Sequence, residues 1–143
     1  MAVLALFPGS FDPFTEGHEA ILRRVLPLFD KVVVAVGVNS EKQYMFSVEE
    51  RVARIRLKLK DCPTVEVTSY EGMTIDLCHK FGANVIVRGI RTAKDFEYEQ
   101  TVAAVNRLQD PSIETLLLMA DPEHIDISST LEREKLIHQK QLP

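Results

Sequence analysis

Hydrophobic residues along this chain gather in short runs that are separated by helically spaced stripes. The clearest run, 32–36, consists of valine and alanine only, and further strand-like runs cover 3–7, 65–68, 84–87 and 113–119. A continuous apolar run is typical of a strand that is covered on both faces, as in a parallel sheet. Because helical stripes separate these runs, the pattern predicts a doubly wound α/β fold. We expect a mainly parallel five-stranded sheet with helices on both faces.

Capping residues predict where the helices begin and end. Thr15, Ser47 and Thr74 each precede an apolar stripe and are suited to accept a hydrogen bond from the first helical turn. Ser47 and Glu50 have the spacing of a capping box. Gly82 follows the third stripe, where a helix favours glycine just past its end. These signals predict helices after Thr15, after Ser47 and from Thr74 to residue 81.

The stripes also predict which helical residues are buried. The first helix is expected to bury Ile21, Val25, Leu28 and Phe29. The second is expected to bury Val48, Val52, Ile55 and Leu59, and to expose a solvated basic face of Arg51, Arg54, Arg56, Lys58 and Lys60. In the helix that opens at 95–99, Phe96 is interpreted as a packing residue, and the apolar stripe is Tyr98, Val102, Val105 and Leu108.

Composition narrows the class of protein. With 143 residues, 45% of them hydrophobic, residues 1–143 are expected to form one domain with a substantial core. The net charge of −4 and the lack of long basic runs argue against nucleic acid or an anionic membrane as the main partner. The apolar start lacks a basic flank and is too short to cross a membrane, so we expect a cytoplasmic protein. Cys62 and Cys78 form no Cys-x-x-Cys pair, and neither a disulfide nor a structural zinc site is expected.

The segment 8–18, PGSFDPFTEGH, joins the first strand to the first helix and holds the main candidate chemistry. Open α/β sheets bind ligands at the carboxyl ends of their strands, where a helix N-terminus attracts anions. Gly9 and Gly17 allow unusual backbone angles and close approach of a phosphate. His18 falls in the first helical turn and would face that anion. The alternative is that Pro-Gly and Asp-Pro only mark turns and His18 only begins a helix.

Other strand ends offer further anion ligands. Lys42 follows the second strand, although a solvated loop lysine is the usual interpretation of such a residue. Arg88 and Arg91 flank Gly89 at the end of the fourth strand, and a guanidinium suits phosphate oxygens. The hydroxyls of 128–130 lie beyond the fifth strand and are either helix caps or phosphate ligands. Together with Ser10, His18 and Thr74, these residues are predicted to line one site.

Four motifs in the chain carry a family resemblance. Ser10-Phe11-Asp12-Pro13 followed by Thr15-x-Gly17-His18 resembles the signature of the nucleotidylyltransferase superfamily, in which the second element binds nucleotide phosphates. Met45-Phe46-x-x-Glu49-Glu50-Arg51-Val52, Arg88-Gly89-Ile90-Arg91 and Asp95-Phe96-Glu97-Tyr98-Glu99 are similar to the phosphopantetheine adenylyltransferase family. The likeness runs from residue 7 to about 134 and implies a Rossmann-like fold.

This resemblance implies a reaction of coenzyme A biosynthesis. ATP and 4'-phosphopantetheine would give dephospho-coenzyme A and pyrophosphate, by direct attack of the substrate phosphate on the α-phosphorus. Magnesium would be carried mainly by the ATP phosphates, with no protein metal ligand required. The family is also typically hexameric and subject to feedback by coenzyme A.

The resemblance also implies roles for individual residues. Catalysis would involve His18, as a donor to the α-phosphate, with Lys42 and Arg91. Phosphopantetheine would be held by Ser10, Lys42, Thr74 and Arg88. ATP would be held by Ser10, Phe11, His18, Gly89, Ile90, Arg91, Glu99, His124, Ile125, Asp126, Ile127, Ser128, Ser129 and Thr130. Two departures from the family are Ser10, where threonine is more frequent, and Glu132, where an apolar residue is usual.

Two other functions stay open on the sequence. The first is another small-molecule nucleotidylyltransferase, acting on nicotinamide mononucleotide or on a sugar or glycerol phosphate. The glycerol-phosphate enzymes are expected to carry Arg-Thr-x-Gly-Ile-Ser-Thr-Thr near the end, but 126–130 lacks the arginine and glycine. The second is a non-catalytic nucleotide-binding module, since a fold alone does not fix function. Retention of His18, Lys42, Arg88 and Arg91 argues against it.

Overall fold

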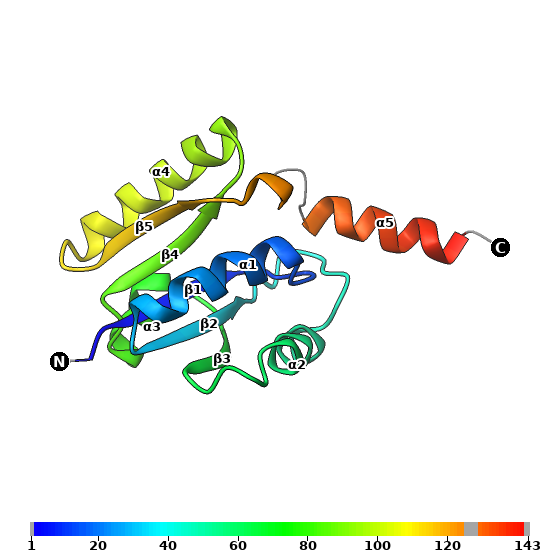
Figure 1. The fold of residues 1–143 in the computed structure, drawn as a ribbon. Helices are drawn as coiled ribbons and strands as arrows, with labels where there is room; N and C mark the ends of the chain where they lie inside the picture. Colours follow the sequence, from blue (N-terminus) through cyan, green and yellow to red (C-terminus); the bar gives the residue numbers. More distant parts are fainter. Residues whose placement is uncertain (1, 125–128, 142–143) are drawn as a thin grey trace.

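The computed structural model describes residues 2–124 and 129–141, and its centre is a five-stranded sheet (Figure 1). All strand pairs are parallel and the order is β3-β2-β1-β4-β5. The strands are β1 (Leu4–Gly9), β2 (Lys31–Gly37), β3 (Val65–Tyr70), β4 (Val85–Ile90) and β5 (Glu114–Met119). The strand order changes direction between β1 and β4, where doubly wound sheets open a crevice for ligands. The predicted α/β fold is confirmed, with a sheet that is parallel throughout.

Helices cover both faces of the sheet (Figure 1). On one face lie α1 (Glu16–Val25) and α2 (Val48–Lys58), and on the other lies α3 (Thr74–Phe81) beside α4 (Ala93–Gln109). Two 3-10 turns, η1 (Leu26–Leu28) and η2 (Pro122–His124), follow α1 and β5. The last helix, α5 (Ser129–Gln141), extends away from the sheet. Within the described residues, no helix has the length and apolar character needed to cross a membrane.

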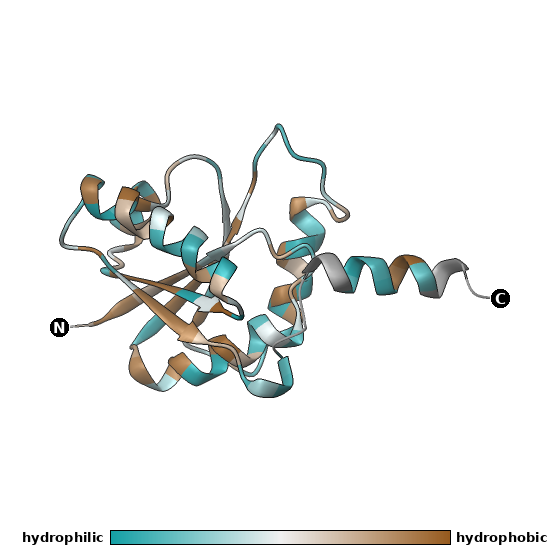
Figure 2. Ribbon diagram, turned by 90° about the horizontal axis from the view of Figure 1, so that it is seen from above, coloured by the Kyte–Doolittle hydropathy of each residue, from teal (hydrophilic) through white to brown (hydrophobic). Residues whose placement is uncertain are grey.

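The central strands hold the core. Residues 32–36 of β2 are fully buried, and Ala5 and Leu6 of the neighbouring β1 are equally inaccessible. In Figure 2 the strands are mainly hydrophobic, whereas the helices alternate between hydrophobic and hydrophilic positions. The core therefore explains the unbroken apolar runs, because both faces of these strands are covered.

Most of the predicted helix ends are confirmed. Thr15 caps α1, and Ser47 accepts a hydrogen bond from the backbone nitrogen of Glu50 at 3.1 Å. Gly82 ends α3 in the left-handed conformation, with φ of 73°. The prediction for Thr74 is wrong, because Met73 is the N-cap and Thr74 is the first helical residue. The Thr74 hydroxyl instead lies 3.2 Å from the hydroxyl of Tyr70.

Several burial predictions are also wrong. Arg51 is only 2% exposed, because it turns away from the basic face and into the loops at the end of the sheet. Leu28 lies in the 3-10 turn after α1 and is exposed. Tyr98 and Leu108 of α4 are 66% and 87% exposed, and Phe96 is also exposed. Three of the four residues predicted as the α4 stripe, Tyr98, Val105 and Leu108, are therefore exposed, and only Val102 is half-buried.

Candidate active site

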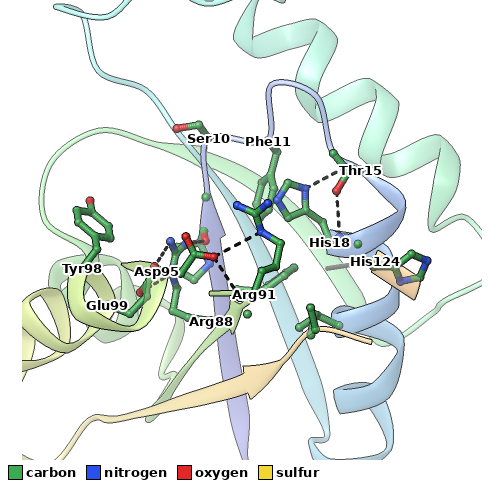
Figure 3. Close-up of a pocket in the computed structure, with 17 residues that line it drawn as sticks. Ser10, Phe11, Thr15, His18, Arg88, Arg91, Asp95, Tyr98, Glu99 and His124 are labelled. Atoms are coloured by element: carbon green, nitrogen blue, oxygen red, sulfur yellow. Dashed lines mark hydrogen bonds and ion pairs between the residues drawn. The ribbon is translucent and has the colours of Figure 1, made fainter. Parts of the chain in front are cut away.

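A cavity of about 360 Å³ opens at the carboxyl ends of β1 and β4, as the strand order predicts (Figure 3). Figure 3 shows side chains from the loop after β1, the start of α1, the end of β4 and the first turns of α4 around this space. Residues 120 and 124, which follow β5, complete the wall. The lining residues are Phe7, Pro8, Gly9, Ser10, Phe11, Thr15, Gly17, His18, Ile21, Arg88, Gly89, Arg91, Asp95, Tyr98, Glu99, Ala120 and His124.

The loop after β1 is shaped around the ring of Phe11. Phe11 has φ of 50°, a backbone angle that is uncommon outside glycine, and its side chain is buried. Its ring packs against Phe7, Phe14 and His18 at centroid distances of 5.4, 5.2 and 5.0 Å. A Cβ atom on Gly9 would lie 2.8 Å from this ring, so the close approach requires glycine. The loop thus forms an aromatic support beneath His18.

His18 is held by the cap of α1. Its Nδ1 accepts from the backbone nitrogen of Thr15 at 2.9 Å, and its own backbone nitrogen donates to the Thr15 hydroxyl at 3.2 Å. A nitrogen that accepts this bond carries no proton, so the ring proton of the neutral imidazole is on Nε2. Burial and the nearby charges of Arg88 and Arg91 lower the pKa of His18 to about 4. At neutral pH the side chain is therefore an uncharged hydrogen-bond donor.

Arg88 is fixed at the floor of the cavity by Glu99. Its Nε lies 2.9 and 3.0 Å from the two carboxylate oxygens of Glu99, and its Nη2 lies 2.6 Å from one of them. Its Nη1 donates to the carbonyl of Pro8. The Glu99 side chain is 6% exposed, so most of this ion pair is removed from water. Arg88 therefore links β4, α4 and the end of β1.

Arg91 lies at the start of the connection from β4 to α4. Its backbone nitrogen donates to Asp95 at 3.1 Å, and its Nε lies 3.5 Å from the same carboxylate oxygen. The Arg91 side chain is 33% exposed and lines the cavity with Arg88. Two guanidinium groups beside a neutral histidine and a helix N-terminus make this cavity suited to an anion.

A second cavity of about 560 Å³ adjoins the first. It is lined by Ser10, Asp12, Lys42, Gln43, Tyr44, Met45 and Arg133. Ser10 is shared with the first cavity and lies at the junction between them. Lys42 is an exposed residue of this second wall, so it is separate from the immediate surroundings of His18 and Arg91.

The structure brings eight of the predicted site residues together in the first cavity. Those that line the first cavity are Ser10, Phe11, His18, Arg88, Gly89, Arg91, Glu99 and His124. Arg88 and Gly89 lie within β4 itself rather than beyond its end. Ile90 is buried in the strand and lines neither of the two cavities, and neither does Thr74. Ile125, Asp126, Ile127 and Ser128 lie outside the described residues, and Ser129 and Thr130 are placed only as the first residues of α5.

Among the lining residues that were not expected from the sequence, two can contact a ligand through polar groups, Asp95 and Tyr98. Asp95 lies four residues after Arg91, the spacing of an ion pair on one helical turn, so a signal was present. Tyr98 was assigned to packing because it continues an apolar stripe, but its exposed side chain reaches the cavity. Its aromatic ring adds apolar surface beside the charged side chains of Asp95 and Glu99 on the same helix.

The described residues contain one group with potential metal ligands, formed by Asp121, Glu123 and His124, whose ligand atoms lie within 4.8 Å of one another. Asp121 already pairs with Arg24 at 3.1 Å, and Glu123 is exposed. Inside the first cavity, the carboxylates of Asp95 and Glu99 are both occupied by arginine groups. The cavity therefore provides cations for phosphate rather than a carboxylate cluster for a metal.

Known proteins with similar sequences transfer nucleotides, in keeping with a cavity that is suited to an anion. Residues 6–135 match the family described as cytidylyltransferase-like. A phosphopantetheine adenylyltransferase of Flavobacterium psychrophilum is 51% identical over 130 residues, which cover 91% of this chain and 85% of the relative. The Bacteroides fragilis protein of the same name is 48% identical over 138 residues, which cover 96% and 91%.

Solved structures share the fold at much lower identity. The bifunctional NMN adenylyltransferase/ADP ribose pyrophosphatase of Francisella tularensis superposes with a TM-score of 0.72 at 20% identity. The match covers 94% of this chain and 42% of that one. The similarity supports the same arrangement of strands and helices.

Proposed function

This chain belongs to the phosphopantetheine adenylyltransferase family and is an adenylyltransferase of coenzyme A biosynthesis, and we propose that its two adjoining cavities bind ATP and 4'-phosphopantetheine. The observation that carries this assignment is the place of Ser10. It borders the cavity that contains His18, Arg88 and Arg91 and also the cavity that contains Lys42. Two anionic substrates bound on either side of Ser10 would meet at that residue.

The first cavity suits the triphosphate of ATP. Arg91 supplies positive charge just beyond the end of β4, and the N-terminus of α1 supplies backbone donors. Arg88 lines the same cavity and is proposed, by family resemblance, to hold the phosphopantetheine that meets ATP there. Gly17 and Gly89 line the same wall, and glycine at 89 allows Ile21 to pack closely, because a Cβ there would lie 3.1 Å from the Ile21 side chain. The ATP ligands carried over from the family are those named above.

The reaction needs no protein nucleophile. A phosphate oxygen of phosphopantetheine attacks the α-phosphorus of ATP and forms the new P–O bond. The bond between that phosphorus and the bridging oxygen to the β-phosphate breaks, and pyrophosphate leaves with the bonding electron pair. The protein contributes by holding the reactants in line, which can supply about 7–11 kcal/mol of the barrier.

His18 stabilises the transferred group. Its Nε2–H donates to an α-phosphate oxygen, on which charge accumulates as the attacking oxygen approaches. Because Thr15 fixes Nδ1 as the acceptor, Nε2 remains a donor over the physiological pH range. Arg91 from one side and Lys42 from the acceptor cavity balance the remaining negative charge.

Magnesium is proposed to enter with ATP. The engaged carboxylates of Asp95 and Glu99 fit a metal that is held mainly by phosphate oxygens and water. When bound, the ion would neutralise charge on the triphosphate. Coenzyme A shares the phosphopantetheine portion of the acceptor, so it is a suitable feedback ligand for the same cavities. We place the reaction in the cytoplasm, in keeping with coenzyme A biosynthesis.

We also propose a homo-oligomer, a hexamer by family resemblance. The exposed apolar residues Tyr98, Val105 and Leu108 of α4 support an interface, because they share one helical face that this chain leaves uncovered.

The test is release of pyrophosphate by the purified protein with magnesium. ATP and phosphopantetheine are supplied together, and parallel reactions contain CTP in place of ATP or nicotinamide mononucleotide in place of phosphopantetheine. Release with ATP and phosphopantetheine alone is the expected result. Release with another pair would move the chain to a related nucleotidylyltransferase activity, and ATP binding without any release would indicate a non-catalytic module.

A further inference from the structure

Arg51 is a buried arginine that the reaction scheme does not use. It lies on α2 and is 2% exposed, the lowest exposure of any charged residue in the described core. Among the described residues, no carboxylate pairs with its guanidinium. Burial of an unpaired guanidinium is costly unless its N–H groups find other partners. The position of those partners indicates what the residue does.

The partners of Arg51 are backbone carbonyls of three separate segments. Its Nη1 donates to Ser10 at 2.7 Å and to Gly37 at 3.1 Å, and its Nε donates to Phe46 at 3.2 Å. The ring of Tyr44 covers the guanidinium, with its centroid 4.0 Å from Cζ. One side chain thereby joins the loop after β1, the end of β2 and the loop that leads into α2.

Asp12 makes the complementary contacts between the same two loops. Its carboxylate accepts from the backbone nitrogens of Met45 and Phe46 at 2.8 and 2.9 Å. The N–H of Phe46 is thus held by Asp12, and its carbonyl is held by Arg51. Two buried groups of opposite charge therefore fix the loop of residues 38–47 against the loop of residues 10–15. Lys42 is carried on the first of these loops, and Ser10 on the second.

We propose that Arg51 is a positioning residue for the acceptor substrate, holding Ser10 and the Lys42 loop at the spacing that phosphopantetheine requires. This inference rests on the proposed function, because it assigns the Lys42 cavity to the acceptor. The donor cavity shares Ser10 but is otherwise supported differently. His18 is held by Thr15, without contact from Arg51, and Arg91 pairs with Asp95. Loss of Arg51 should therefore affect the two substrates unequally.

The experiment compares Arg51→Lys with wild type. Lysine keeps the charge and the length of the stem, but its single ammonium cannot span three carbonyls as the planar guanidinium does. The matched control is Arg54→Lys, one turn along α2, because Arg54 is exposed and stacks on the Phe46 ring at 4.0 Å. KM for each substrate, kcat, and calorimetric binding of ATP and of phosphopantetheine are measured, with the melting temperature.

For Arg51→Lys we expect KM and the dissociation constant for phosphopantetheine to rise about tenfold, the scale of one or two lost hydrogen bonds. ATP binding should change less than about twofold, and Arg54→Lys should leave all constants near wild type. Equal weakening of both substrates, or no change in either, would overturn the inference. Should Arg51→Lys not fold, Arg51→Gln keeps two N–H donors without a buried charge and must show the same selective loss.

The measurements on wild-type protein distinguish a failure of this inference from a failure of the proposed function. Wild-type protein that binds phosphopantetheine but releases no pyrophosphate would contradict the proposed reaction, and the binding comparison would still decide the role of Arg51. Wild-type protein that does not bind phosphopantetheine would overturn both.

Discussion

The Nδ1 atom of His18 lies 2.9 Å from the backbone nitrogen of Thr15, so one imidazole closes the cap of α1 and also faces the cavity. Glutamate or glutamine usually occupies this third position of a capping box. A histidine there accepts the same backbone bond through one nitrogen and presents the other as a donor. The local structure of the helix end thus sets the tautomer that the proposed reaction uses.

Two variants of His18 separate its capping of α1 from its proposed role in catalysis. His18→Ala should lose turnover by about 10²–10³, the usual effect of removing one transition-state donor. It should also lose about 1 kcal/mol of unfolding free energy, because the backbone N–H of Thr15 loses its acceptor. His18→Gln restores an acceptor for Thr15 but does not place a donor where Nε2 lies. We expect near-normal stability with turnover still low, measured by urea unfolding and pyrophosphate release. Normal turnover in His18→Gln would reduce the role of His18 to capping.

The lowered pKa of His18 predicts how stability depends on pH. Burial and the nearby arginines reduce the pKa from its ordinary 6.5 to about 4 in the folded protein. Between these values the unfolded chain binds the proton and the folded chain does not, so stability rises with pH up to about 6.5 and is flat above. The difference is on the order of 3 kcal/mol at most. Urea titrations from pH 4.5 to 7.5 should show this slope in wild type and lose it in His18→Gln. An equal slope in both proteins would contradict the lowered pKa.

The ion pair of Arg88 and Glu99 predicts a large loss of stability when one partner is neutralised. Glu99→Gln leaves the guanidinium in the cavity floor without its carboxylate, and a broken buried pair typically costs about 3–5 kcal/mol. Because Arg88 retains part of its exposure, we expect the lower end of that range. Glu97→Gln, on the exposed side of the same helix, is the control and should change stability by less than about 0.5 kcal/mol. Similar losses in both variants would argue against the ion pair as the cause.

The accuracy of sequence-based prediction depended on whether a signal was local. Strand β2 and the end of α3 were predictable because a continuous apolar run and Gly82 each have one dominant structural meaning. Arg51 was misassigned although it lies four residues before the buried Ile55 and so shares its helical face. The sequence did contain a signal for burial of Arg51, because a basic residue stood within an apolar stripe. Thr74 was misassigned because its hydroxyl bonds Tyr70 of the preceding strand, a contact that capping rules do not include.

The candidate site was predictable where it depended on topology. Parallel strands bring their carboxyl ends to one edge, so residues of the β1 and β4 connections had to converge. The division into two cavities was not predictable, because it depends on how the Lys42 loop folds over Ser10. That arrangement is set by Asp12 and Arg51 through contacts with distant backbone groups.

The contact between Gly9 and Phe11 gives a prediction about the loop after β1. In Gly9→Ala the new Cβ would lie 2.8 Å from the Phe11 ring, which Phe7 and Phe14 hold in place. Overpacking of this kind costs about 1–3 kcal/mol. Turnover should also fall, because Phe11 supports His18. Gly37→Ala is the control, since its Cβ would meet no atom closer than 3.7 Å. A melting temperature for Gly9→Ala equal to that of Gly37→Ala would contradict the proposed clash.

The uncovered face of α4 gives a prediction about assembly. Leu108 is 87% exposed and shares a helical face with Tyr98 and Val105, so a partner subunit would bury all three. Leu108→Glu places a charge in that interface and should reduce the mass measured by light scattering toward that of the monomer. The control is Leu57→Glu, because Leu57 is 67% exposed on α2 across the sheet. An unchanged mass for Leu108→Glu together with a reduced mass for Leu57→Glu would move the interface to α2, and unchanged masses for both would exclude either helix as the main contact.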